Sequence, residues 1–259
     1  MPKRYLGQYY LLDPAILLRI IDAAQLTPHD LIVEIGPGPG RMTRLLSETA
    51  GKVIAIELDE ELYDKLKTRF AAYQNTELIH GDALDFPYSE LPAFKVVSNI
   101  PYYITTPIIF TLLEKARNLK SMTLTVQKEV GERIVAKPGG KTYGVLSLMV
   151  QYFGNPAFKF VISRKAFKPV PKVDSAVIAI ESYDKPPVEV ADKELFFSII
   201  RTAFSQRRKM LSNALKSLHH DSRQLCERAE IDPRRRPETL DMEEFARLAY
   251  VLFNERQQD

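Results

Sequence analysis

Asn99-Ile100-Pro101-Tyr102 combines residue types that can hold an amino group in place for reaction with an electrophile. The Asn99 side-chain oxygen and the main-chain carbonyl of Ile100 can together accept two N–H bonds from one nitrogen. This favours a pyramidal nitrogen whose lone pair is free to attack. Pro101 holds the neighbouring carbonyl because its ring fixes φ, and Tyr102 can stack on a base. The four residues are therefore a candidate catalytic turn, although Asn-x-Pro is also common where a strand runs into a loop.

A glycine-rich turn, Gly36-Pro37-Gly38-Pro39-Gly40, lies earlier in the chain, and Glu34 stands two residues before its first glycine. Glycines after a strand let the main chain approach a ligand. A NAD fingerprint needs its third glycine at position 41, where this chain has Arg41. The observed spacing instead resembles the S-adenosylmethionine (AdoMet) loop of class I methyltransferases. An ordinary Gly/Pro turn is the alternative interpretation.

Two carboxylates follow at the ends of the next two apolar runs. Glu57, about 20 residues past the glycine turn, can accept the hydroxyls of a ribose, which does not separate AdoMet from NAD. Asp82 can accept the exocyclic amine of the cofactor's adenine. Either carboxylate could instead be a strand-end charge or a turn cap.

Short apolar runs precede all of these residues and alternate with helical patterns. Strands are expected over 31–35, 53–56, 78–79, 94–98 and 122–126, with helices over 41–49 and 59–71. Such alternation predicts an α/β fold, with a parallel sheet and helices on both faces. The glycine turn, Glu57, Asp82 and Asn99 then stand at four successive strand ends, which favours a shared site.

The pattern changes after residue 155. Runs over 158–162 and 173–180 flank a Pro-rich loop, 167–171, and could form an antiparallel hairpin at the end of the sheet. Lys185-Pro186-Pro187 is the best linker, and 192–253 shows only helical periodicity. We expect a first domain over 1–184 and a small all-helical domain over 188–259.

A base within a duplex or a folded RNA must leave its stack to reach such a turn. Phe167 could cover the second face of the extruded base, or it could be a core residue. A cluster of cations without a nearby acid could attract phosphates or form a solvated helix face. The cluster consists of Arg201, Arg207, Arg208, Lys209 and Lys216.

Taken together, these motifs resemble one family, the small-subunit ribosomal RNA adenine dimethyltransferases, over nearly the whole chain. The matching segments are 6–12, 33–38, 56–59, 81–83, 99–102, 126–130, 167–175 and 204–215. The resemblance implies a class I (Rossmann-like) AdoMet-dependent methyltransferase sheet and a helical C-terminal domain. It also implies transfer of four methyl groups to N6 of two adjacent adenosines near the 3′ end of 16S rRNA, within the assembling small ribosomal subunit.

By position, the family's cofactor contacts fall on Tyr9, Leu11, Gly36, Gly38, Glu57, Asp82 and Asn99. Tyr9 and Tyr103 each stand where the family usually has Asn. If residue 9 contacts its ligand through the main chain, a tyrosine there changes nothing, whereas a side-chain contact would be lost. The substitution at Tyr103 bears on substrate positioning rather than on the class of reaction.

Three other functions remain as alternatives. A 23S rRNA adenine methyltransferase of the antibiotic-resistance type shares the catalytic half, but segment 204–215 favours the small-subunit enzyme. A non-catalytic ribosome-assembly factor would not need the intact turn at Asn99–Tyr102. A nicotinamide dehydrogenase is disfavoured by Arg41 and by the lack of an acid/base residue.

Composition excludes several other classes of protein. The 259 residues contain one cysteine, Cys226, which excludes a disulfide framework, and the histidines lack the spacing of metal ligands. No apolar run is long enough for a transmembrane helix, and the start of the chain lacks the apolar core of a signal peptide. A net charge of +3 permits an RNA partner without requiring one. We expect a cytoplasmic protein that binds no metal and acts as a monomer.

Overall fold

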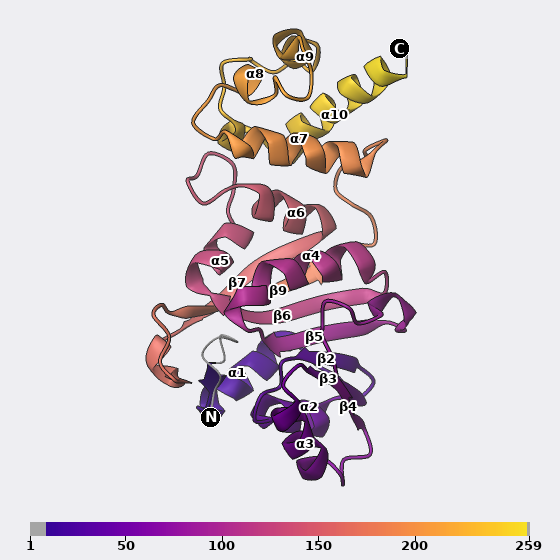
Figure 1. Ribbon diagram of the computed structural model, residues 1–259, viewed down its shortest axis with the longest axis vertical. Coiled ribbons are helices and arrows are strands. Elements are labelled where there is room, and N and C mark those ends of the chain that lie inside the picture. The colour runs from indigo at the N-terminus through magenta and orange to yellow at the C-terminus, as the bar shows by residue number, and fades with distance from the viewer. Residues whose placement is uncertain (1–8, 258–259) are drawn as a thin grey trace. The chain divides into compact units, whose positions relative to one another are not determined.

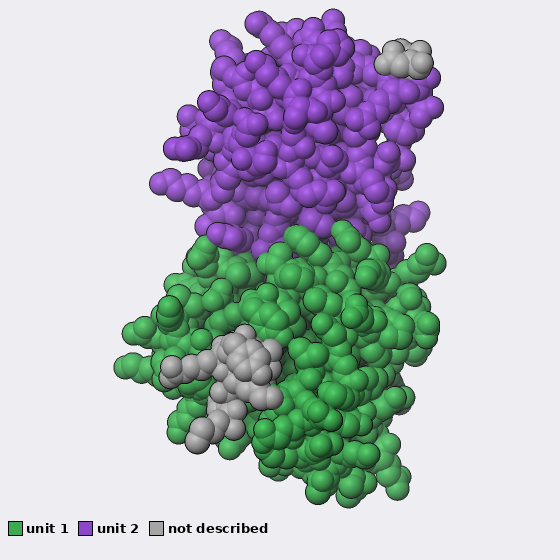
Figure 2. All heavy atoms as spheres, viewed as in Figure 1, with its two compact units in different colours: residues 1–132, 154–183 green, residues 133–153, 184–259 purple. Residues whose placement is uncertain are grey.

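A computed structural model describes residues 9–257 (Figure 1). Contacts between residues divide the chain into two compact units, coloured separately in Figure 2. The first unit comprises Met1–Glu132 and Gly154–Tyr183, and the second comprises Arg133–Phe153 and Asp184–Asp259. Residues 133–153 are thus grouped with the C-terminal helices, whereas the expected first domain, 1–184, includes them. Whether 1–184 and 188–259 fold separately stays a prediction.

A seven-stranded mixed sheet forms the centre of the first unit. Its five parallel strands give the order β4-β3-β2-β5-β6, and β9 and β7 extend it in antiparallel fashion beyond β6. The antiparallel hairpin expected after residue 155 is therefore confirmed. The strand bounds are β2 Leu31–Ile35, β3 Lys52–Glu57, β4 Thr76–His80, β5 Phe94–Asn99, β6 Leu119–Gln127, β7 Gly154–Ile162 and β9 Ser175–Ser182.

The central strands are continuous apolar runs because helices cover the sheet. In β3, every residue from Val53 to Glu57 is buried. Helix α1 (Pro14–Ala24) begins at Asp13, whose carboxylate accepts the N–H groups of Ala15 and Ile16. The other helices of this unit are α2 (Arg41–Thr49), α3 (Glu60–Arg69) and α4 (Thr105–Lys115), and α5 (Lys128–Ile134) follows β6. The bounds of helices α2 and α3 lie within about two residues of the ranges expected from the sequence.

The order of the strands determines where a ligand can bind. From β2 the chain moves outward through β3 to β4, and then crosses back to β5 on the other side of β2. Ligands of open α/β sheets bind at such a reversal, outside the carboxyl ends of the strands. Gly36, Glu57, Gly81 and Asn99 all stand at or directly after those ends.

A separate two-stranded ribbon borders this edge of the sheet. Strand β1 (Tyr10–Leu11) pairs in antiparallel fashion with β8 (Phe167–Lys168), so that Tyr10 faces Lys168 and Leu11 faces Phe167. Leu11 and Phe167 belong to the same buried cluster as Leu17 and Ile20 of α1. The ribbon thereby fixes the start of the described chain against the sheet.

The second unit is helical, as predicted for 192–253. Its helices are α6 (Val145–Phe153), α7 (Lys193–Ser205), α8 (Leu211–Ala214), α9 (Ser222–Arg228) and α10 (Met242–Arg256). Aromatic rings join them, since Tyr152 contacts Phe196 and Phe197, and Phe204 contacts Phe245. Among the described residues, no helix is both long and apolar enough to cross a membrane.

Candidate active site

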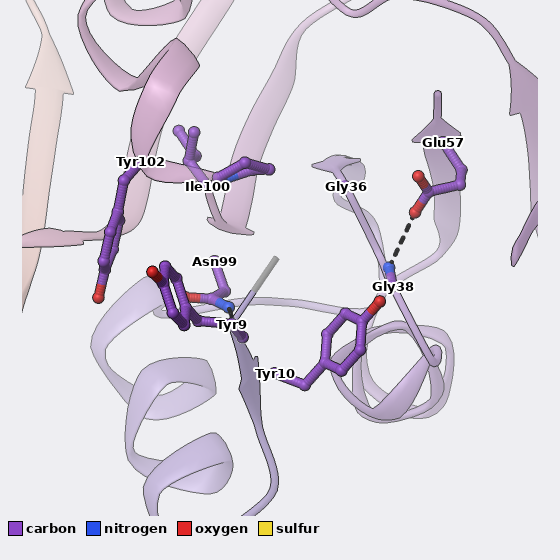
Figure 3. Close-up of a pocket in the computed structure, with 9 residues that line it drawn as sticks. Tyr9, Tyr10, Gly36, Gly38, Glu57, Asn99, Ile100 and Tyr102 are labelled. Atoms are coloured by element: carbon purple, nitrogen blue, oxygen red, sulfur yellow. Dashed lines mark hydrogen bonds between the residues drawn. The ribbon is translucent and has the colours of Figure 1, made fainter. Parts of the chain in front are cut away.

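The glycine turn after β2 forms the floor of the site. Gly36 and Gly38 have φ angles of 66° and 57°, in the left-handed region that favours glycine. A Cβ atom added to Gly36 would lie 3.3 Å from Cδ of Pro101, so the turns after β2 and β5 meet here. The N–H of Gly38 donates to Oε2 of Glu57 at 3.0 Å, and the N–H of Asp59 donates to Oε1 at 3.0 Å. Glu57 therefore holds the glycine turn against the end of β3 (Figure 3).

The amide of Asn99 is oriented by the start of the described chain. Its Nδ2 donates to the main-chain oxygen of Tyr9 at 3.0 Å. This bond fixes the orientation of the amide, which leaves Oδ1 on its other side as the acceptor. The carbonyl of Pro101 accepts the N–H of Ile104 at 3.1 Å, which leaves the carbonyl of Ile100 as the neighbouring acceptor for a ligand.

The side chain of Tyr102 is held by a hydrogen bond at its hydroxyl and by a neighbouring aromatic ring. Its hydroxyl is hydrogen bonded to Oγ of Ser175, the first residue of β9, at 2.7 Å. The ring of Tyr9 lies beside it, with centroids 5.2 Å apart and planes inclined by 33°. Burial raises the pKa of the Tyr102 hydroxyl, so this group stays protonated at neutral pH. Tyr102 therefore offers a preformed aromatic surface and not a base.

Three adjoining cavities share Gly36 in their walls. The central cavity is also lined by Tyr9, Glu57, Asn99 and Tyr102. The second, here called the apolar cavity, extends over Asp82 and Ala83 to Leu58 and Tyr103. The third, the Glu34 cavity, lies between the glycine turn and Leu11. An elongated ligand can therefore follow the ends of β2, β3 and β5.

Two carboxyl groups of the site, those of Glu34 and Glu57, are buried, whereas Asp82 is exposed. Burial, together with the charge of Glu57, raises the pKa of Glu34 to about 8. Oε2 of Glu34 has no hydrogen-bond partner among the described residues. Burial also raises the pKa of Glu57, although the main-chain N–H groups that it accepts oppose this effect. The ion pairs of the described chain include neither carboxyl. A cationic group bound beside Glu34 would lower its raised pKa and favour the carboxylate form.

Tyr10 is a site residue that the sequence interpretation missed. Its ring lies on Gly38, because a Cβ atom added there would be 2.9 Å from Cε1 of Tyr10. Burial and the nearby charges of Glu57, Asp59 and Glu61 raise the pKa of Tyr10 to about 12. Ser175 was also missed as a partner of Tyr102. A single sequence carries no signal for either long-range contact.

Most of the predicted site residues are brought together. Tyr9, Gly36, Gly38, Glu57, Asn99, Ile100, Pro101 and Tyr102 line the central cavity. Asp82 lines the apolar cavity, where its Oδ1 accepts the N–H of Leu84 at 2.9 Å. Leu11 lines the Glu34 cavity and is otherwise buried. Of segment 6–12, residues 6–8 lie outside the described part of the chain.

Phe167 is not at the site. Its ring is fully buried in the hydrophobic cluster of α1, β2 and β9. The cause is the pairing of β8 with β1, which sets Phe167 opposite Leu11 and turns the ring into the core. In this conformation the aromatic neighbour of Tyr102 is Tyr9. Tyr103 lines the apolar cavity, whereas Asn99 lines the other two.

The predicted basic residues all belong to the second unit. Arg201 is on α7, and Arg208, Lys209 and Lys216 lie in the turns around α8, all exposed. The guanidinium of Arg207 lies over the ring of Phe204, 5.7 Å from its centroid. The ion pairs formed by described residues include none of these five cations. Their charge is available to a partner.

Comparisons with known proteins identify the family to which this chain is similar. The family model described as "Ribosomal RNA adenine dimethylase" matches residues 2–254. Ribosomal RNA small subunit methyltransferase A of Clostridium acetobutylicum is 47% identical, over 97% of this chain and 94% of the relative. The protein of the same name from Moorella thermoacetica is 44% identical, over 97% of this chain and 93% of its own length.

Two solved structures resemble the whole chain. A dimethyladenosine transferase from Plasmodium falciparum has a TM-score of 0.79 at 29% identity, covering 95% of this chain and 98% of that one. The 23S rRNA methyltransferase ErmE has a TM-score of 0.75 at 27% identity, covering 94% and 99%. Both likenesses extend over the sheet and the helical region, which confirms the class I methyltransferase fold. Because the family model matches residues 2–254 and relatives of 44–47% identity match over 97% of the chain, the chain belongs to the ribosomal RNA adenine dimethylase family.

Proposed function

We propose that this protein transfers methyl groups from AdoMet to N6 of two adjacent adenosines near the 3′ end of 16S rRNA, in a precursor of the small ribosomal subunit. The observation that carries the proposal is the fixed amide of Asn99. One N–H of the amide donates to the carbonyl of Tyr9, and Asn99 and Ile100 both line the central cavity, where Oδ1 of Asn99 and the carbonyl oxygen of Ile100 would form an acceptor pair. An amino group matches such a pair.

The residues of the three cavities fit AdoMet. The unpartnered Oε2 of Glu34 suits the ammonium group of the methionine part, and Glu57 suits the hydroxyls of the ribose. Leu58 and Tyr103 are among the exposed large apolar side chains and line the apolar cavity, whose walls suit the adenine ring, with Asp82 at its edge. When bound, AdoMet supplies an electrophilic methyl group on a sulfonium.

The protein's own residues account for the rest of the reaction. The amino nitrogen of adenine is a poor nucleophile because its lone pair is delocalised into the ring. Oδ1 of Asn99 and the carbonyl of Ile100 would accept its two N–H groups and favour a pyramidal nitrogen, as a fixed dipole pair stabilises charge that develops there. Tyr102, held by Ser175, would stack on the base. A strong base is unnecessary, since the proton leaves a cationic nitrogen.

Two observations support an rRNA of the small subunit as the partner: the names of the curated relatives and the exposed positive charge of the second unit. The curated relatives carry small-subunit names, and the cations of α7 and the following turns supply a surface for phosphates. The similarity to ErmE supports a second candidate, a 23S rRNA adenine methyltransferase. We further propose that the protein acts in the cytoplasm and as a monomer.

One experiment separates these candidates. The purified protein is incubated with AdoMet and with unmethylated small and large subunits, and each RNA is digested and analysed by mass spectrometry. The proposal expects N6,N6-dimethyladenosine at two adjacent positions of 16S rRNA. Methylation of 23S rRNA alone would support the second candidate. An RNA complex without any methylation would indicate a non-catalytic assembly factor. Asn99→Ala, which should bind subunits without methylating them, is the control.

A further inference from the structure

A second basic segment borders the site in the first unit. Between residues 159 and 172 the chain carries five cations and no Asp or Glu. Four of them lie in the connection between β7 and β9, and all four are exposed: Arg164, Lys165, Lys168 and Lys172. We call these four residues the basic rim.

The three lysines of the basic rim form no close ion pair among the described residues, although Glu129, Glu132 and Asp174 line the same hollow as Lys172. The ion pairs of the described residues do not include Lys165, Lys168 or Lys172. Elsewhere in the same unit, Lys52 pairs with Glu77 at 2.8 Å and Lys95 with Asp30 at 2.9 Å. Lysine is a compact point charge that suits phosphate oxygens. Three unpaired ammonium groups on one connection form a surface for a polyanion.

The rim is also a preformed structure. The N–H of Arg164 donates to Oδ1 of Asp174 at 2.9 Å, and Nη1 of Arg164 donates to the carbonyl of Lys172 at 3.2 Å. The carbonyl of Asp174 accepts the N–H of Lys128 at 3.0 Å, which ties the connection to α5. Asp174 is thereby engaged with the main chain. Less ordering is therefore needed when a ligand binds.

The connection that carries the rim is joined to residues of the central cavity at two points. Lys168 is the strand partner of Tyr10, which lines that cavity. Ser175, one residue past Asp174, is hydrogen bonded to Tyr102. An adenosine extruded toward Asn99 stays covalently linked to its neighbours in the RNA. The RNA strand on either side of it must therefore pass close to the opening of the central cavity. Lys168 is the rim cation tied most directly to the lining of that cavity, through its pairing with Tyr10.

We propose that the basic rim binds phosphate groups of the RNA strand next to the target adenosine, as a contact surface separate from the cations of the second unit. This inference rests on the proposed function, because it takes the occupant of the cavity to be an extruded nucleotide. Exposed Val170 and Val173 lie among the lysines. A protein partner is the outcome that would contradict the inference.

The test removes the charges and follows salt dependence. The variant is Lys165→Gln/Lys168→Gln/Lys172→Gln. Its control is Lys67→Gln/Lys115→Gln/Lys120→Gln, which removes three exposed lysines of the same unit that are equally unpaired in the described structure. Binding to unmethylated small subunits is measured from about 50 to about 300 mM KCl, and again to a protein-free 16S rRNA 3′ fragment. Each lost phosphate contact lowers the slope of log K against log[salt] by about 0.7–0.9.

We expect the slope to fall by about 2–3 in the rim variant and to stay unchanged in the control. KM for subunits should rise, while kcat at saturating subunits and the Kd for AdoMet should match the unaltered protein, which also verifies folding. An unchanged slope would overturn the inference. So would weaker binding to subunits with normal binding to protein-free RNA, since that result indicates a protein partner. If the unaltered protein methylates no adenosine in either subunit, the proposed function fails, whatever the slopes.

Discussion

Replacing Asn99 by aspartate tests the orientation of the amide directly. The two side chains have almost the same shape, and both present an oxygen to a substrate. They differ at the atom that faces Tyr9, where the amide donates a hydrogen bond of 3.0 Å and a carboxylate cannot. Two acceptors, the carboxylate and the carbonyl of Tyr9, would then face one another. We therefore expect aspartate to be a poor substitute in this protein.

The size of the loss follows from that single contact. A polar group left without its partner in a partly buried site costs about 1–3 kcal/mol. If the loss is felt in the transition state, kcat/KM falls by about 5- to 150-fold, since about 1.4 kcal/mol corresponds to a factor of ten. Asn99→Ala removes the acceptor as well and should fall further. In the Asn99→Asp variant a protonated carboxyl group can again donate to the carbonyl of Tyr9, so the activity of this variant should decrease as pH rises.

The assay is transfer of tritiated methyl groups from AdoMet to unmethylated small subunits, at pH values from about 5.5 to about 8.5. Activities of the variant are divided by those of the unaltered protein at each pH, which cancels effects common to both. The Kd for AdoMet, measured by calorimetry, separates a damaged cofactor site from a damaged amide. A variant that is fully active at every pH would refute the assigned role of the Tyr9 carbonyl.

Three further changes probe the rest of the site. Glu57→Gln should weaken AdoMet binding about tenfold in calorimetry, because a neutral amide accepts hydroxyl groups less strongly; an unchanged Kd would contradict the role of Glu57. Gly40→Ala should lower the free energy of unfolding by about 2–4 kcal/mol in urea, because φ is 76° and the new Cβ would lie 2.6 Å from Cδ2 of Leu66; a loss under about 1 kcal/mol would argue against this clash. Glu34 has a pKa of about 8 in the folded protein, against 4.5 for a free carboxyl. The folded state therefore keeps a proton that the unfolded chain releases, and stability falls as pH rises between these values. Glu34→Gln should remove that part of the fall in urea titrations at about pH 5 and about pH 8, and equal pH dependence in both proteins would contradict it.

Residues at strand ends were the predictable part of the site. Gly36, Glu57 and Asn99 stand at the ends of buried apolar runs, and Asp82 follows the short Leu78-Ile79 run of a strand that is only partly covered. The carboxyl ends of parallel strands meet at one edge. Their grouping therefore follows from local pattern and topology alone. The antiparallel end of the sheet was predictable for the same reason.

Contacts between distant segments could not be predicted in this way. The pairing of β1 with β8 involves two residues on each side, too few for a recognisable strand pattern, yet it decides that Phe167 is buried and that Tyr9 reaches Asn99. Similarly, the grouping of residues 133–153 with α7 depends on rings such as that of Tyr152, whose partners Phe196 and Phe197 lie far along the chain. An apolar side chain shows that it will be buried, but not against what.

The bond from Asn99 to residue 9 ends on a peptide oxygen, an atom that every amino acid possesses. Position 9 can therefore change its side chain during evolution while the reactive amide keeps its direction. The tyrosine at position 9, where the resemblance drawn from the sequence implies an Asn, is compatible with this main-chain contact. Because only the main chain of residue 9 holds Asn99, a substitution at this position would change the space beside Tyr102 in the central cavity and leave the hydrogen bond to the amide in place.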